Sequence, residues 1–355
     1  GFLMQLMRLI NKMRKIKSNK KNPLAKIFIK LCRIFGFEII DQSNFNIPTS
    51  NKSLNENISI PGKSSVTLPL GNVEITRPVK SLDVILRTCM SVNMLTQSKK
   101  RMFEKNKEEY TRRTLVSLIK SVDHAKNVFE NTKFKIFIID HNSQRNQVES
   151  MKNLLEKSNI DYDITDLQLE RFSKHIKKTN EENKEVTSNQ KSNMSNIHQS
   201  LTFAKEKSED LTYFVEDDYI HEKNAINEMI FTYERISSQL NRELILCPAD
   251  YPYLYSKVDN TNIFLGSEKH WRKVDETLCT FLTSKKILEK YWTKFISMCQ
   301  FEHYPFEKPL HEIYKDEYCL SPIPSLAIHL TNINSIFGLS PNVNWKKIWE
   351  DNKNY

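Results

Sequence analysis

From residue 82 onward, short apolar runs alternate with longer amphipathic stretches, and this order constrains the fold more than any other feature. The runs "LDVILRTC", "FKIFIID" and "LTYFVEDD" are rich in β-branched and aromatic residues, as buried strands are. Between them, "YTRRTLVSLIKSVDHAKNVF" and "QVESMKNLLEKS" carry apolar residues at helical spacing. The repetition predicts right-handed βαβ units, and therefore an α/β fold with a mostly parallel sheet flanked by helices.

Polar side chains follow three of these predicted strands at the point where each strand ends. They are Arg87 and Thr88, then Asp140 and His141, then Glu216, Asp217 and Asp218. The carboxyl ends of parallel strands meet at one edge of a sheet, which is where such folds bind ligands. Three consecutive carboxylates repel one another, so we expect a divalent cation or a basic side chain beside them.

Glycine and cysteine usage excludes several classes of site. The chain has 355 residues but only six glycines, and neither GxGxxG nor GxxxxGK[ST] occurs, so a dinucleotide fingerprint and a P-loop are both absent from the sequence. None of the six cysteines is paired at CxxC spacing. The sequence therefore shows no zinc or disulfide pattern, which favours a reducing compartment.

The positive charge is concentrated at the N-terminal end. Residues 1–35 hold ten Lys or Arg and no acid, so the other 43 basic residues are balanced by all 43 acidic ones. A nucleic-acid footprint across the whole domain is not supported. In residues 1–40, Leu, Ile, Phe and Met recur at helical spacing among the bases, and charges interrupt every apolar run well before transmembrane length.

We interpret residues 1–40 as basic amphipathic helices on an anionic membrane surface. The alternative is a helix docked on the protein's own body with its bases facing water. Residues 41–80 are rich in Asn, Ser and Pro without a sustained period, and we interpret them as a linker.

Over residues 82–335 the ordered features resemble the GT-A nucleotide-sugar glycosyltransferases, in particular the family-2-like branch. "LRTCMSVN" is similar to the opening strand that contacts the nucleotide. "IIDHNS" is similar to the second strand end, which places Asp140 and His141 by the base and ribose, although the family usually has a carboxylate in place of His141. "NMSNIHQSLTFAKE" resembles the helix before the metal motif, where Asn196 matches the family's Asn and Ser195 replaces its Arg.

"FVEDDYI" resembles the DxD motif in its EDD form. The resemblance implies that Asp218 binds a divalent metal, Mn²⁺ or Mg²⁺, and that Asp217 belongs to the donor-binding set. Side chains alternate on a strand, so Glu216 would share a face with Asp218 and reach the ribose or a metal-bound water. "SLAIHLT" resembles the strand carrying the terminal metal-binding histidine, here His329. The metal would act as a Lewis acid on the diphosphate leaving group.

"PFEKPLHEIY" resembles the helix whose start carries the catalytic base. Alignment on Leu310 places Glu307 in that position, with Glu302 and Glu312 as rivals. A base there implies a single displacement with inversion, because it takes a proton from the acceptor hydroxyl as the sugar carbon is attacked.

The resemblance thus implies a metal-dependent glycosyltransferase of the hexosyltransferase type, with a GT-A domain at residues 81–340 and a C-terminal tail at 341–355. A UDP-sugar donor is favoured, the acceptor is a lipid or cell-surface glycan precursor, and the location is the inner face of the cytoplasmic membrane. One alternative is a sugar-phosphate nucleotidyltransferase, although the tip "RTCMSVNML" lacks the glycines of its nucleotide loop. The other is a non-catalytic, membrane-associated protein that binds sugar nucleotides.

Overall fold

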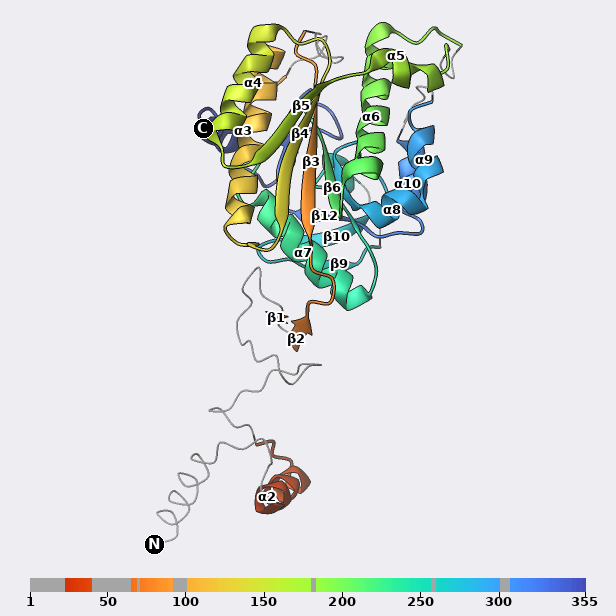
Figure 1. Ribbon diagram of the computed structural model, residues 1–355. Helices are drawn as coiled ribbons and strands as arrows, with labels where there is room; N and C mark the ends of the chain where they lie inside the picture. Colours follow the sequence, from red (N-terminus) through yellow and green to blue (C-terminus); the bar gives the residue numbers. More distant parts are fainter. Residues whose placement is uncertain are drawn as a thin grey trace. The chain divides into compact units, whose positions relative to one another are not determined.

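The computed structural model describes residues 23–39, 65–68, 71–91, 101–179, 183–256, 260–300 and 307–355. The chain divides into two compact units, residues 1–49 and residues 50–355 (Figure 1). The first unit contains the helix α2 (Pro23–Ile34). No helix among the described residues has the length and hydropathy needed to cross a membrane.

The second unit is built around a nine-stranded sheet, as far as the described residues show. In sheet order its strands are β5 (Asp161–Asp166), β4 (Lys133–Asp140), β3 (Ser81–Thr88), β6 (Leu211–Glu216), β11 (Phe281–Ser284), β8 (Ile245–Leu246), β12 (Cys319–Ile323), β10 (His270–Val274) and β9 (Ile263–Leu265). Only β10 and β11 run against the other seven. The predicted α/β fold with a mostly parallel sheet is confirmed.

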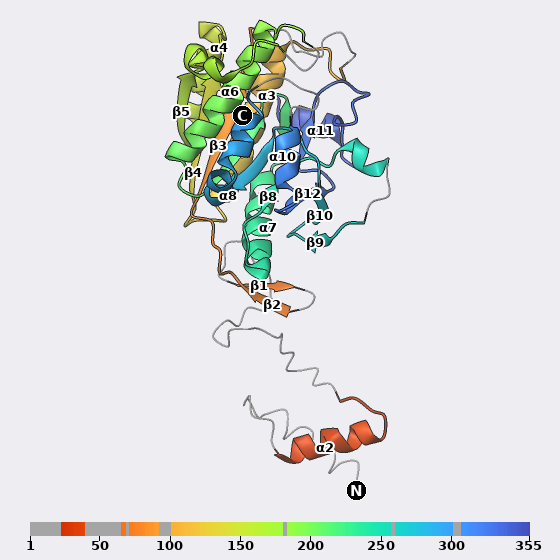
Figure 2. The ribbon, with the colours of Figure 1, turned by 90° about the vertical axis from the view of Figure 1, so that its right-hand side faces the viewer.

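Helices cover both faces of the sheet, which is why the central strands are apolar on both sides. The helices are α3 (Lys107–Lys126), α4 (Arg145–Lys157), α5 (Leu169–Phe172), α6 (Ser188–Lys207), α7 (Ala225–Leu240), α8 (Lys285–Lys290), α9 (Trp292–Ser297), α10 (Lys308–Ile313) and α11 (Trp345–Asp351). α3 packs with α4 and α7, whereas α6 packs with α8 and α9. Figures 1 and 2 show α3 and α6 on opposite sides of β3 and β4. The parallel strands β3, β4 and β6 end side by side at one edge of the sheet.

Three segments differ from their sequence interpretation. A hairpin, β1 (Ser65–Leu68) with β2 (Gly71–Glu74), lies within the predicted linker at residues 41–80, of which residues 41–64 lie outside the description. α6 begins at Ser188, six residues before the apolar pattern that predicted it, because Thr187 and Gln190 form a capping box around a polar first turn.

The predicted tail at residues 341–355 contains α11, which packs against the body. Trp349 is buried in a small second core with Tyr110 of α3, and Phe103 stacks on the Trp349 ring at 4.1 Å. Arg113 of α3 donates to the Trp349 carbonyl. A seven-residue helix carries too little periodicity to be recognised in the sequence.

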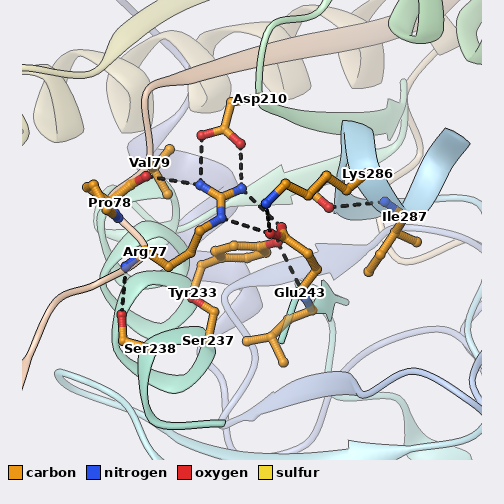
Figure 3. A network of polar contacts seen from close by, with 12 residues as sticks. Arg77, Pro78, Val79, Asp210, Tyr233, Ser237, Ser238, Glu243, Lys286 and Ile287 are labelled. Atoms are coloured by element: carbon orange, nitrogen blue, oxygen red, sulfur yellow. Dashed lines mark hydrogen bonds and ion pairs between the residues drawn. The ribbon is translucent and has the colours of Figure 1, made fainter. Parts of the chain in front are cut away.

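A largely buried ion-pair network fixes the segment that leads into β3 (Figure 3). Arg77 and Asp210 precede β3 and β6, so the network lies at the opposite end of these strands from their polar tips. The Arg77 guanidinium donates to Asp210 at 2.5 and 3.0 Å and to Glu243 at 2.9 and 3.0 Å. The Tyr233 hydroxyl and Lys286 also donate to Glu243, at 2.6 and 3.1 Å. Burial alone would raise the pKa of Glu243, but these donors, Arg77 foremost, lower it to about 2.

We expect Arg77→Met to lower the free energy of unfolding by about 3–5 kcal/mol. The substitution removes the guanidinium that pairs with both of these largely buried carboxylates. Urea unfolding measures this value. Lys286→Met removes a solvent-exposed partner of the same Glu243, and should cost at most about 1 kcal/mol. If the two variants lost the same free energy of unfolding, burial would not be the reason why the Arg77 ion pairs stabilise the fold.

Candidate functional site

Asp218 and His329 meet where two short strands pair at the carboxyl edge of the sheet. β6 ends at Glu216, the chain turns at Asp217 and Asp218, and β7 (Tyr219–His221) then pairs with β13 (Ala327–His329). This register sets His329 opposite Tyr219. The Asp218 Oδ2 atom lies 3.4 Å from the His329 Nε2 atom. The two residues that the resemblance assigns to a metal are therefore neighbours, although they lie far apart in the chain.

The His329 ring is held by groups around it. Its Nδ1 lies 2.7 Å from the Phe337 carbonyl oxygen, and this hydrogen bond requires a proton on Nδ1. The neutral ring therefore presents the Nε2 lone pair toward Asp218. The imidazole stacks on the Tyr219 ring, with centroids 4.5 Å apart and planes 5° apart. The Tyr219 hydroxyl in turn is 2.6 Å from that of Tyr251. Outer contacts of this kind orient metal-binding histidines.

Asp218 and His329 shift each other's pKa in the directions that favour an ion pair. Burial by itself would raise the pKa of Asp218, but His329, Arg101 and Lys107 outweigh it and lower that pKa to about 2. Burial would lower the pKa of His329, yet Asp218 and then Glu216 raise it above its ordinary value. A cation that binds here competes with protons for the Nε2 atom of His329.

Tyr219→Leu should weaken Mn²⁺ binding roughly 10- to 100-fold, as losses of outer-shell support do elsewhere. The reason is that the imidazole loses the ring that holds its plane. Calorimetric titration with Mn²⁺ and UDP measures the effect without turnover. Tyr219→Phe keeps the ring and deletes only the contact with Tyr251, so it should retain most of the affinity. Undiminished binding in the Leu variant would remove Tyr219 from this role.

Asp217 turns away from His329 and ties together the elements around the site. Its Oδ2 atom accepts hydrogen bonds from the Cys89 backbone at 3.2 Å and the Thr111 hydroxyl at 3.0 Å, and the Lys107 amine lies 3.4 Å away. Burial raises the pKa of Asp217, against the opposing effect of Lys107. These contacts anchor α3 and the loop after β3 to the turn between β6 and β7.

Glu216 has different neighbours again. Its carboxylate lies 3.2 Å from Arg87 at the end of β3 and accepts a hydrogen bond from the Thr280 hydroxyl at 3.2 Å. The Thr280 hydroxyl also accepts from the Glu216 backbone at 3.1 Å. Each of the three adjacent carboxylates is thus balanced by its own partners, which explains how the chain tolerates them.

The second strand tip is locked by hydrogen bonds within the protein. The Asp140 carboxylate is buried and accepts from the Thr88 hydroxyl at 2.6 Å, the Ser143 hydroxyl at 2.6 Å and the Ser143 backbone at 3.0 Å. The His141 backbone donates to the Thr88 carbonyl at 2.9 Å, and its side chain is half-buried at the rim. Thr88 and Asp140 therefore shape this tip, while His141 is the side chain that remains at the surface.

Asn196 and Arg87 connect α6 to the sheet. Asn196 is buried and donates through Nδ2 to the Ile139 carbonyl of β4 at 3.1 Å. Arg87 donates to the Asn193 side chain of α6 at 3.3 Å in addition to its pairing with Glu216. The amide of Asn196 is therefore used to position α6, whereas Arg87 places a cation beside Glu216.

Glu307 precedes α10, is buried, and lies within electrostatic reach of the same cluster. Burial and, to a smaller extent, Glu216 raise its pKa to about 7, against the opposing effects of a backbone hydrogen bond, Arg87 and His329. The rival Glu312 is half-buried near the C-terminal end of α10, and the other rival, Glu302, lies outside the described residues. A buried carboxyl that titrates near neutral pH is suited to take up a proton.

The donor set at Asp218 and His329 fits a hard divalent cation that a substrate helps to hold. No cluster of three or more His, Cys, Asp or Glu ligands occurs among the described residues. Mg²⁺ in particular is commonly bound by one or two carboxylates together with substrate phosphates and water, rather than by a complete protein cage. The Asp218 carboxylate matches that mode, and the His329 imidazole adds a nitrogen ligand.

Several contributors to this site carry no signal in the sequence. Lys107 and Thr111 lie on α3, Thr280 lies just before β11, and Phe337 acts through its backbone carbonyl. Each reaches the site through tertiary packing, so spacing within a motif cannot reveal it.

Comparisons with known proteins define no family. No protein-family model matches the chain, and no curated protein matches it. Among solved structures, TarS of S. aureus is 12% identical with a TM-score of 0.34 over 62% of this chain and 34% of that chain. A UDP-glucose pyrophosphorylase complexed with UDP-glucose is 8% identical with a TM-score of 0.36, covering 78% and 97%.

Mouse xyloside xylosyltransferase 1 is 11% identical with a TM-score of 0.36, covering 66% of this chain and 76% of that chain. The chain spans about a third of the length of TarS. These values are too low to assign the chain to a family or an activity.

Proposed function

We propose that this chain is a metal-dependent glycosyltransferase that moves a sugar from a nucleotide-sugar donor, preferably a UDP-sugar, to an acceptor hydroxyl with inversion. The observation that supports the proposal most is the pairing of Asp218 with His329 at the carboxyl edge of parallel strands, within electrostatic reach of the buried Glu307. Ligands bind at this edge in open α/β sheets.

In this proposal Asp218 and His329 hold Mn²⁺ or Mg²⁺, which supplies Lewis acidity to the departing diphosphate when bound. Glu307 accepts the proton of the acceptor hydroxyl. Glu216, oriented by Arg87, hydrogen-bonds donor hydroxyls. His141 at the rim contacts the base or ribose.

We assign the acceptor to a lipid or cell-surface glycan precursor at the inner face of the cytoplasmic membrane. The six cysteines all lie in the part of the chain that the structure describes and form no disulfide there, in keeping with a reducing compartment. Nucleotidyl transfer remains the rival activity and is distinguished by its products. It joins a sugar phosphate to a nucleoside triphosphate, and the nucleoside triphosphate loses pyrophosphate.

A donor screen by thermal unfolding tests the binding part of the proposal. Mn²⁺ together with UDP or a UDP-sugar should raise the unfolding temperature more than either does alone, because a ligand stabilises the state that binds it. His329→Ala should abolish this synergy. A synergistic shift with UTP that UDP-sugars fail to reproduce would favour the nucleotidyltransferase instead.

A further inference from the structure

The helix α2 exposes a continuous apolar stripe. Ile27, Phe28, Leu31 and Ile34, with Phe35 just past the helix end, follow at i, i+1, i+4, i+7 and i+8 and share one face. Ile27 is 57% exposed, Phe28 55%, Leu31 48%, Ile34 73% and Phe35 72%. No residue of α2 is buried. A stripe of this size is larger than the scattered apolar residues of an ordinary protein surface.

The charges of α2 lie mostly on the opposite side of the helix. Lys26, Lys30 and Arg33 follow each other at i, i+4 and i+7 and form a second stripe. Lys26 and Arg33 face away from the apolar stripe, whereas Lys30, three residues after Ile27 and four before Ile34, lies at its edge. Arg33 is moreover engaged by Glu38, with its Nη2 atom 2.6 Å from the carboxylate.

The helix ends in a way that continues the apolar surface. Gly36 adopts a φ of +79°, in the left-handed region. The Phe37 backbone donates to the Cys32 carbonyl at 2.9 Å and the Gly36 backbone to the Arg33 carbonyl at 3.1 Å, as in a Schellman cap. Phe37 beyond this turn is 68% exposed. The turn thus adds an aromatic side chain just past the helix end.

We infer that α2 docks on an anionic lipid bilayer by inserting its apolar stripe, with Lys26 on the water side. The charge of the surrounding segment favours an anionic bilayer over other ligands. Residues 1–35 carry ten bases and no acid, which complements an anionic surface. A coiled-coil partner needs a narrow a/d seam over three or more heptads, whereas α2 has 12 residues and a broad apolar arc. The inference is independent of the proposed glycosyl transfer.

Sedimentation with vesicles of phosphatidylcholine and phosphatidylglycerol tests this with the full chain. The double variant Phe28→Gln, Leu31→Gln should bind at least about 100-fold more weakly, because two inserted side chains become polar. Lys26→Gln is the matched control on the side away from the apolar stripe and should lose less than about fivefold. Circular dichroism and thermal unfolding should be unchanged in both, since all three positions are exposed.

A spectroscopic arm reports insertion itself. Compared with the parent protein, Phe28→Trp should gain a blue-shifted emission when vesicles are added, and bromine-labelled acyl chains should quench it. The inference is overturned if the double variant sediments with vesicles like the parent protein. It is equally overturned if the Phe28→Trp variant gains no blue-shifted emission and high salt alone releases the protein from the vesicles. It is also overturned if the stripe instead mediates dimers. Sedimentation velocity would then show a dimer that the double variant does not form and that added vesicles do not dissociate.

Discussion

Asp218→Asn should lower kcat/KM for sugar transfer by at least about a thousandfold, which corresponds to about 4 kcal/mol of transition-state stabilisation. The amide keeps the shape of the side chain but removes the negative charge that would bind the cation and that pairs with His329 at 3.4 Å. Metal-dependent nucleotide binding should disappear together with transfer. Steady-state kinetics at several Mn²⁺ concentrations, with calorimetry for UDP, measure both effects.

The fold should survive this substitution. The Asp218 carbonyl accepts the Leu330 backbone N–H at 2.9 Å, and the side-chain change leaves that bond in place. Glu209→Gln is a suitable control. Glu209 lies just before the first residue of β6, far from the turn that carries Asp218, and forms an exposed ion pair with Lys133. Transfer at the parental rate by the Asn variant would show that Asp218 is not a metal ligand.

Glu307→Gln should lower kcat by about 100- to 10,000-fold while the dissociation constant for the donor stays nearly unchanged. The amide preserves shape and deletes basicity, and a general base contributes only while the proton is being transferred. Single-turnover rates together with donor titrations separate the two quantities. Glu302→Gln and Glu312→Gln are the matched controls, because either could hold the role instead.

The pH dependence gives Glu307 a signature of its own. The base must be ionised, and burial raises its pKa to about 7, so kcat should fall about tenfold per pH unit as the pH drops below about 7. For stability the sign is opposite. The raised pKa favours the protonated folded state, so this group's contribution to stability declines as pH rises from 4.5 to about 7. Glu307→Gln removes that decline, and its loss of activity should therefore not reflect unfolding.

Two outcomes would change the assignment. If Glu307→Gln is fully active and one control is inactive, the base is that other glutamate and the inverting mechanism stands. If all three variants are active and the product keeps the donor's anomeric configuration, the enzyme is retaining and no general base of this kind operates.

The parallel half of the sheet was predictable because its signals are local. β3, β4 and β6 are continuous apolar runs that end in polar residues, and helical periodicity separates them. The pairing of Asp218 with His329 could be expected from the resemblance alone, since no local pattern links residues so far apart in the chain. β7 and β13, which create that pairing, have only three residues each, too few for a recognisable period.

The separate roles of the three carboxylates were not predictable from the sequence. Strand alternation places Glu216 and Asp218 on one side, and His329 is within reach of both. The alternation does not reveal that Asp217 is buried against Lys107 and Thr111, because that depends on how α3 packs over the turn. Asp140 and Asn196 likewise carry polar groups that the fold itself uses.

The central claim is that the Asp218 and His329 edge supports metal-dependent transfer of a sugar from a nucleotide sugar. Incubation of the full chain with vesicle-bound lipid acceptors, Mn²⁺ and radiolabelled UDP-sugars, followed by product isolation and anomeric analysis by NMR, tests it most directly. The account predicts labelled glycan of inverted configuration, formed with release of UDP and abolished by EDTA or by His329→Ala. Product formed equally well in EDTA, or by the His329 variant at the parental rate, would contradict it.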